Sequence, residues 1–183
     1  MYMKKSMIKG IVSVIFASAL LCSCDLLDLT PKAAVTVKTY FKNESELELY
    51  ANRFYSDILP GGNGIYKEIG DNMIWIPLAS EVSLTRTVPE KGGGWSFEAL
   101  RHINFLLENI GNCPDAAAVR KYTGVAKFFR AHYYFNMVKR FGDVPWLDHV
   151  PGTDDPALYK ARDSRDFVME KVIEDIDEAI RLF

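Results

Sequence analysis

The chain has 183 residues, of which 49% are hydrophobic and 25% charged, and its formal net charge is −2. This composition fits one ordinary globular core. The near-neutral net charge removes the electrostatic case for binding nucleic acid, since proteins that do so carry a basic patch or stripe. Three cysteines, Cys22, Cys24 and Cys113, are too few and too poorly distributed for a disulfide framework.

Residues 1–23 have the pattern of a lipoprotein signal peptide. Three lysines precede an apolar run over residues 11–21, which is about half the length needed to span a bilayer. The run ends in Leu21-Cys22-Ser23-Cys24, which resembles the bacterial lipobox. Cys24 is therefore predicted to become the lipid-bearing first residue of the mature protein, anchored in a membrane by its acyl chains. The alternative is a general secretory signal cut nearby, which would leave Cys24 as a free thiol.

Residues 24–43 are predicted to form an extended tether, because they show no helical period and Pro31 interrupts them early. Residues 44–183 are predicted to form an all-α domain. The first helix is expected to open at residues 43–45, with a capping box made by Ser45 and Glu48, and to stop at Pro60.

Three further helices are indicated downstream. One follows Ser96 and runs to Ile110, one runs from Asp115 to Phe141, and the last begins near Asp163 or Ser164. The second of these is the central one, because it carries two apolar faces about 100° apart and should have neighbours on both sides. One face includes Phe129, and the other includes Phe128 and Phe135. Gly124 would permit the close approach of a neighbour.

Residues 61–94 form a long irregular insertion that is rich in glycine and lacks a sustained period. Long insertions in a compact domain are usually functional or disordered. Saccharides stack on aromatic rings while acidic, amide and guanidinium groups bind their hydroxyls. These residue types fit a ligand site, and the candidate ligand-binding residues in or beside the insertion are Asp71, Asn72, Trp75, Arg86 and Trp95. The competing interpretation places Trp75 and Trp95 in the core, as it does Trp146.

Nothing in the sequence supports catalysis, a metal site or a cofactor. Glu170, Glu174 and Asp177 share one flank of the last helix, as a solvated face does, and neighbours on one helix cannot face each other across a cleft. The three histidines lack metal-ligand spacing. Asn104, at the edge of an apolar stripe, is expected to tie down a neighbouring loop. Cys113 is expected to be either a free thiol or lightly buried.

Three segments together resemble the SusD/RagB family of surface lipoproteins. They are AKFFRAHYYFNMVKRFGDVPW in the central helix, WSFEALRHINFLLENI before it, and RDSRDFVMEKVIEDIDEAI after it. Family members are about three times as long, so the resemblance covers their N-terminal part. It implies a body of tetratricopeptide-like helical hairpins, outer-membrane attachment facing the cell exterior, and capture of nutrients for a SusC-type TonB-dependent transporter.

The first functional hypothesis is therefore a non-catalytic lipoprotein that binds a nutrient, expected to be a glycan, and delivers it to that transporter. The alternative is a helical-repeat scaffold that holds other envelope proteins together and binds no ligand. A lipid-anchored glycosidase is disfavoured, because no facing pair of carboxylates can be found.

Overall fold

The computed structural model describes residues 40–61, 76–78, 80, 82–88, 90, 93 and 95–183. Its elements are helices α2 (Glu44–Ile58), α3 (Glu98–Asn109), α4 (Ala116–Phe141) and α5 (Arg165–Leu182), with the short 3₁₀ helices η3 (Ile110–Asn112) and η4 (Pro156–Tyr159). In these ranges there is no strand, only an isolated bridge between Val144 and Asp163. The predicted all-α class is confirmed. The signal peptide, Cys24 and nearly all of the tether lie outside the described residues.

Helix α2 opens where the sequence indicated, but its cap differs from the predicted one. Asn43 is the N-cap, and its side-chain oxygen accepts a hydrogen bond from the Glu46 amide at 3.0 Å. Glu46 in turn accepts from the Lys42 amide at 2.8 Å. The predicted capping box of Ser45 with Glu48 is wrong, because Asn43 already takes the extended cap conformation and leaves Ser45 inside the first turn.

Helix α4 begins and ends where the sequence indicated. Asp115 caps it by accepting from the amides of Ala117 and Ala118, at 2.9 and 3.2 Å. Gly142 ends it with φ +71°, a backbone conformation that only glycine adopts without strain. The 26 residues between these caps form the helix that the other helices pack against.

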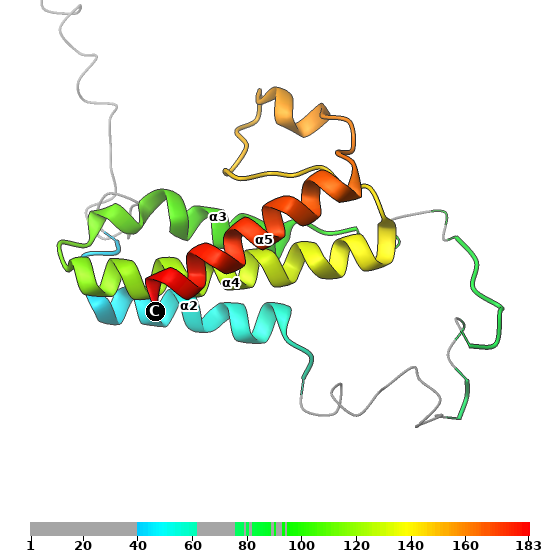
Figure 1. Ribbon diagram of the computed structural model, residues 1–183, viewed down its shortest axis with the longest axis horizontal. Coiled ribbons are helices and arrows are strands. Elements are labelled where there is room, and N and C mark those ends of the chain that lie inside the picture. The colour runs from blue at the N-terminus through cyan, green and yellow to red at the C-terminus, as the bar shows by residue number, and fades with distance from the viewer. Residues whose placement is uncertain are drawn as a thin grey trace, which may run out of the picture. The chain divides into compact units, whose positions relative to one another are not determined.

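Two clusters of buried side chains surround α4. One joins it to α2 and α3 through Phe54, Ile103 and Phe129. The other joins it to α5 and to the chain after Gly142 through Tyr134 and Val168. Figure 1 shows α4 running between α2 and α3, with α5 crossing it. The sequence predicted a helix with neighbours on both sides.

One part of that expectation is wrong. Phe128 and Phe135, placed on the second buried face, are 44% and 43% exposed. Of the same face, Ala131 is buried in the second cluster and Val138 is partly buried against it. The prediction for Gly124 is confirmed, because the ring of Phe183 lies against it at a distance that leaves no room for a larger side chain without a shift.

A buried charged group links three parts of the fold. Arg130 on α4 is 5% exposed and Asp175 on α5 is 3% exposed. The Arg130 Nε and Nη2 atoms donate to the two Asp175 carboxylate oxygens at 2.6 and 2.8 Å. Arg130 Nη1 donates to the side-chain oxygen of Asn104 on α3 at 3.3 Å. The guanidinium group of Arg130 thus donates hydrogen bonds to two neighbouring helices at once.

Asn104 also holds the chain that follows α4 in place. Its amide nitrogen donates to the carbonyl oxygens of Leu147 and His149, at 2.9 and 3.1 Å. The prediction that Asn104 ties down a loop is confirmed. Lys127 completes the cluster with 3.0 Å and 2.8 Å ion pairs to Asp175 and Glu178.

Two further sequence expectations are confirmed by burial. Glu170, Glu174 and Asp177 lie exposed on α5, and Trp146 is buried against Tyr134 with ring centroids 4.3 Å apart. Cys113, the cysteine within the described residues, is buried and outside any disulfide. None of the described helices is both long and apolar enough to cross a membrane.

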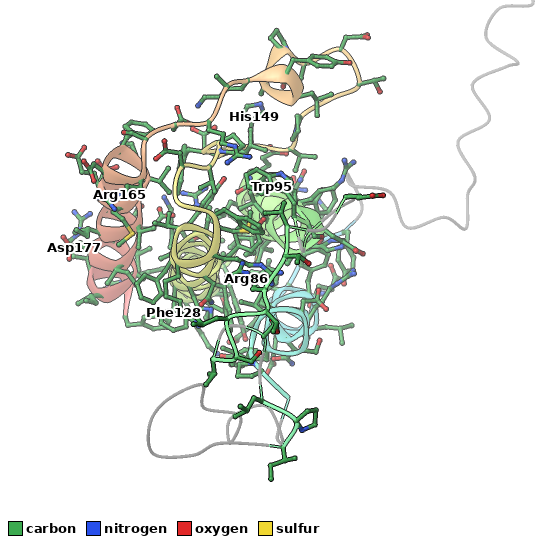
Figure 2. All side chains as sticks on the ribbon, turned by 90° about the vertical axis from the view of Figure 1, so that its right-hand side faces the viewer. Arg86, Trp95, Phe128, His149, Arg165 and Asp177 are labelled. Carbon is green, nitrogen blue, oxygen red and sulfur yellow. The ribbon has the colours of Figure 1, made fainter. Side chains whose placement is uncertain are left out.

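Replacement of Asp175 by Ala should lower the free energy of unfolding by about 3–5 kcal/mol, because Arg130 would remain buried without its partner. Urea denaturation followed by circular dichroism measures this. Asp177→Ala is the matched control, since Asp177 lies on the outer side of the same helix (Figure 2) and should change stability by no more than about 0.5 kcal/mol. Equal losses in the two variants would contradict the account.

Candidate ligand-binding pocket

An open pocket of about 1420 Å³ lies around the start of α3 and the end of α4. Its walls come from four parts of the chain: Ser80, residues 86–88 and Gly93; the approach to α3 with its first two turns; the end of α4 with the loop after it; and residues 157–162. Figure 2 views the molecule toward this end, with Arg86, Trp95 and His149 labelled, while Arg165 and Asp177 lie apart on α5.

The approach to α3 is held in place by α4. The Tyr133 hydroxyl donates to the Ser96 carbonyl oxygen at 2.6 Å. Arg140, near the end of α4, donates to the Gly93 carbonyl oxygen at 2.7 Å. The expected cap of α3 by Ser96 is wrong, because the N-cap is Phe97 and no side chain caps this helix. The Ser96 hydroxyl only accepts a long hydrogen bond from the Glu98 amide, at 3.4 Å. These contacts fix the backbone on both sides of Trp95.

Trp95 is half-buried and lines the pocket. Its ring meets those of Phe97 and Phe141 edge-on, with centroids 5.7 and 4.8 Å apart. The guanidinium carbon of Arg162 lies 4.9 Å from the ring centroid, a cation–π contact. Trp95 therefore packs against the second core cluster and also borders the pocket. The core interpretation holds in part, and ligand binding by Trp95 stays a prediction.

The opposite wall is the loop after α4, whose position depends on the buried cluster. Asn104 holds the carbonyl oxygens of Leu147 and His149, and the Tyr134 hydroxyl accepts from the Leu147 amide at 2.6 Å. The Asp163 carboxylate accepts from the Trp146 amide at 2.7 Å. Each of these polar contacts joins the loop to an element outside it, which makes the wall a defined surface.

His149 stands on this wall between two carboxylates. Its Nδ1 lies 2.9 Å from the Asp148 carboxylate and its Nε2 lies 2.8 Å from that of Asp155. Hydrogen bonding to Asp148 and then to Asp155 raises the pKa of His149. The same ring lowers the pKa of Asp148, and an accepted hydrogen bond from the Ala157 amide lowers that of Asp155. At mildly acidic pH the three groups form an ion-paired triplet.

Arg86 and Trp95, two of the candidate ligand-binding residues, both line this pocket. Asp71, Asn72 and Trp75, the other three, lie outside the described residues. Among the described residues no cluster of histidine, cysteine or carboxylate side chains could hold a metal ion.

Sequence reasoning missed the other cations of the lining. They are Arg101 on α3, Arg140 on α4, and Lys160 and Arg162 after η4. Only the fold brings these residues together, because up to about 60 positions separate them along the chain. A cation next to an aromatic residue in sequence, as in Arg140-Phe141, was the one local signal available.

A family model named SusD-like_2 and described as "Starch-binding associating with outer membrane" matches residues 87–183. The chain therefore belongs to the SusD-like family, as the sequence resemblance implied. The match includes α3, α4, α5 and most of the pocket wall, with Trp95.

A solved structure agrees with this assignment at the level of the fold. It is the crystal structure of a SusD-like protein from Bacteroides fragilis, 22% identical in sequence, with a TM-score of 0.58. The alignment covers 79% of this chain and 30% of that protein, so the chain spans about a third of its relative's length. No curated protein matches.

The two carboxylates should hold the His149 ring protonated above its ordinary pKa of about 6.5. A raised native pKa means that its stabilisation is complete below about pH 6.5 and is lost as the pH rises through the native value. NMR titration of the three imidazoles measures this. His102 and His132 serve as internal references, since partial burial lowers the pKa of each. Asp148→Asn should lower the His149 midpoint, and an unchanged midpoint would contradict the triplet.

Proposed function

We propose that this protein binds a nutrient glycan at the cell surface, without catalysis, and delivers it to a SusC-type TonB-dependent transporter in the outer membrane. The observation that carries the proposal is the pocket beside Trp95, within the stretch that the starch-binding family model matches. The family is described as associating with the outer membrane, which fits a ligand met outside the cell.

The dimensions of the pocket support a saccharide ligand. Its volume of about 1420 Å³ exceeds the roughly 300–1,000 Å³ common for small-molecule sites. An oligosaccharide of several units needs such room. Aromatic surface at Trp95 and Phe141 borders hydrogen-bonding side chains at Arg86 and Glu98, which is the combination that sugar hydroxyls and C–H faces require.

Attachment to the membrane is proposed to come from Cys24. Two or three acyl chains on this residue, at about 0.8 kcal/mol per buried methylene, would anchor the protein firmly. Asp25 and Asp28 follow at once and resemble the signals that send such lipoproteins to the exterior. Residues 24–43 would then act as the tether between the lipid and the helical domain of residues 44–183.

The transporter is the proposed partner because binding without turnover is useful only if the ligand is handed on. The competing hypothesis, an envelope scaffold, requires no ligand and leaves the pocket without a role. Affinity electrophoresis of the protein through gels containing a panel of glycans separates the two. Retarded migration without release of reducing sugar supports the binding protein, and unretarded migration throughout the panel supports the scaffold.

Replacement of Trp95 by Ala should weaken binding to the retarding glycan at least tenfold, about 1.4 kcal/mol, because the ring supplies the stacking surface. Isothermal titration calorimetry measures the change. Phe135→Ala is the control, since Phe135 is also a half-exposed aromatic residue but lies outside the pocket lining. Equal affinities in wild type and Trp95→Ala would contradict the assignment of this pocket.

Replacement of Cys24 by Ala should release the protein from the membrane fraction, because no thiol would remain at the lipidation position. Metabolic labelling with radioactive palmitate, followed by cell fractionation, tests this. Cys22→Ala is the matched control and should keep both label and membrane attachment. Sedimentation of the Cys24→Ala protein with the envelope would refute the anchor.

A further inference from the structure

The charges of the pocket differ from those of the whole chain. The described residues of the lining include five cations, Arg86, Arg101, Arg140, Lys160 and Arg162, and one carboxylate, Glu98. The formal net charge of the chain is −2, so the excess of positive charge is local. Low-dielectric walls around charges of one sign focus their potential into the cleft and attract ligands of the opposite sign.

Most of these cations are not used to hold the fold together by ion pairs. Lys160 is paired with Asp163 at 2.7 Å. In the part of the chain that the structure describes, by contrast, Arg101, Arg140 and Arg162 have no carboxylate within ion-pair distance. Arg140 contacts a backbone carbonyl, and Arg162 contacts the Trp95 ring. Three guanidinium groups at one opening therefore keep their charge available to a ligand.

The position of Arg162 bears on the kind of sugar. Its guanidinium lies over the Trp95 ring, 4.9 Å from the centroid. A neutral sugar that stacked on this face would have to displace the Arg162 guanidinium from the ring. It carries no anion with which the displaced guanidinium could pair. An acidic sugar can contact the ring edge and pair its anion with the guanidinium. The planar fork of arginine matches carboxylate and sulfate oxygens in a bidentate manner.

We infer that this pocket selects anionic oligosaccharides, those that carry uronic acid carboxylates or sulfate esters, over neutral ones. Arg101, Arg140 and Arg162 confer the preference, and Trp95 supplies an aromatic contact at its ring edge beside them. The inference rests on the proposed glycan-binding function and narrows its ligand class.

The test compares polymers that differ in charge alone. The purified protein is run by affinity electrophoresis against polygalacturonate and its methyl ester, and against dextran sulfate and dextran. We expect the protein to bind the acidic member of one pair or of both at least tenfold more tightly than the neutral member. Its affinity for the acidic polymer should fall as the salt concentration is raised. The pair that shows the difference identifies the anion as carboxylate or sulfate.

Variants assign the effect to the pocket. Arg162→Gln and Arg101→Gln should each reduce binding of the acidic polymer at least fivefold, with circular dichroism unchanged because both side chains are exposed. Arg181→Gln removes the same charge from α5, outside the lining, and should leave the affinity within twofold.

The outcomes separate this inference from the proposed function. Neutral polymers bound as tightly as acidic ones, or an acidic preference that Arg162→Gln and Arg181→Gln reduce equally, would overturn the anionic preference and leave glycan binding in place. Failure of all four polymers and of a wider panel of acidic and neutral glycans to retard the protein would overturn both.

Discussion

The ion pair between Arg130 and Asp175 is the constraint on which the other contacts depend. Burying one charge alone would cost several kcal/mol, so each of the two requires the other. Because Arg130 also reaches Asn104, the pair sets the spacing of α3, α4 and α5 together. Apolar packing could hold these helices at many small offsets, whereas directed hydrogen bonds accept very few.

The same cluster connects the core to the candidate site. Asn104 is buried between Arg130 and the loop after α4. Its side-chain oxygen accepts a hydrogen bond from Arg130, and its amide nitrogen donates to two carbonyl oxygens of the loop. That loop is a wall of the pocket, and Trp146 within it lies under the Arg130 guanidinium at 5.2 Å. A ligand site formed by irregular chain thus obtains a fixed wall from a helical core, as precise recognition requires.

Sequence pattern alone predicted the helices well, since Asp115, Gly142 and Ser164 are local signals that act within one turn. It failed where the burial of a side chain depends on residues that are far away in the sequence. Asp175 stands among solvated carboxylates in sequence and is buried in the fold, because Arg130, 45 positions away, faces it. Phe128 and Phe135 looked buried because periodicity shows which side is apolar, not how much of that side a neighbour covers. Arg86 and Trp95 were found by residue type, whereas Arg140 and Arg162 join them only through tertiary structure.

A double-mutant cycle on Arg130 and Asp175 tests the central claim most directly. Arg130→Met, Asp175→Leu and the double variant are compared with wild type by urea denaturation. The account predicts a coupling free energy of about 3 kcal/mol or more, with the double variant far more stable than the sum of the two single losses implies. Single losses that add within about 0.5 kcal/mol would show that the two residues act independently and would contradict the account.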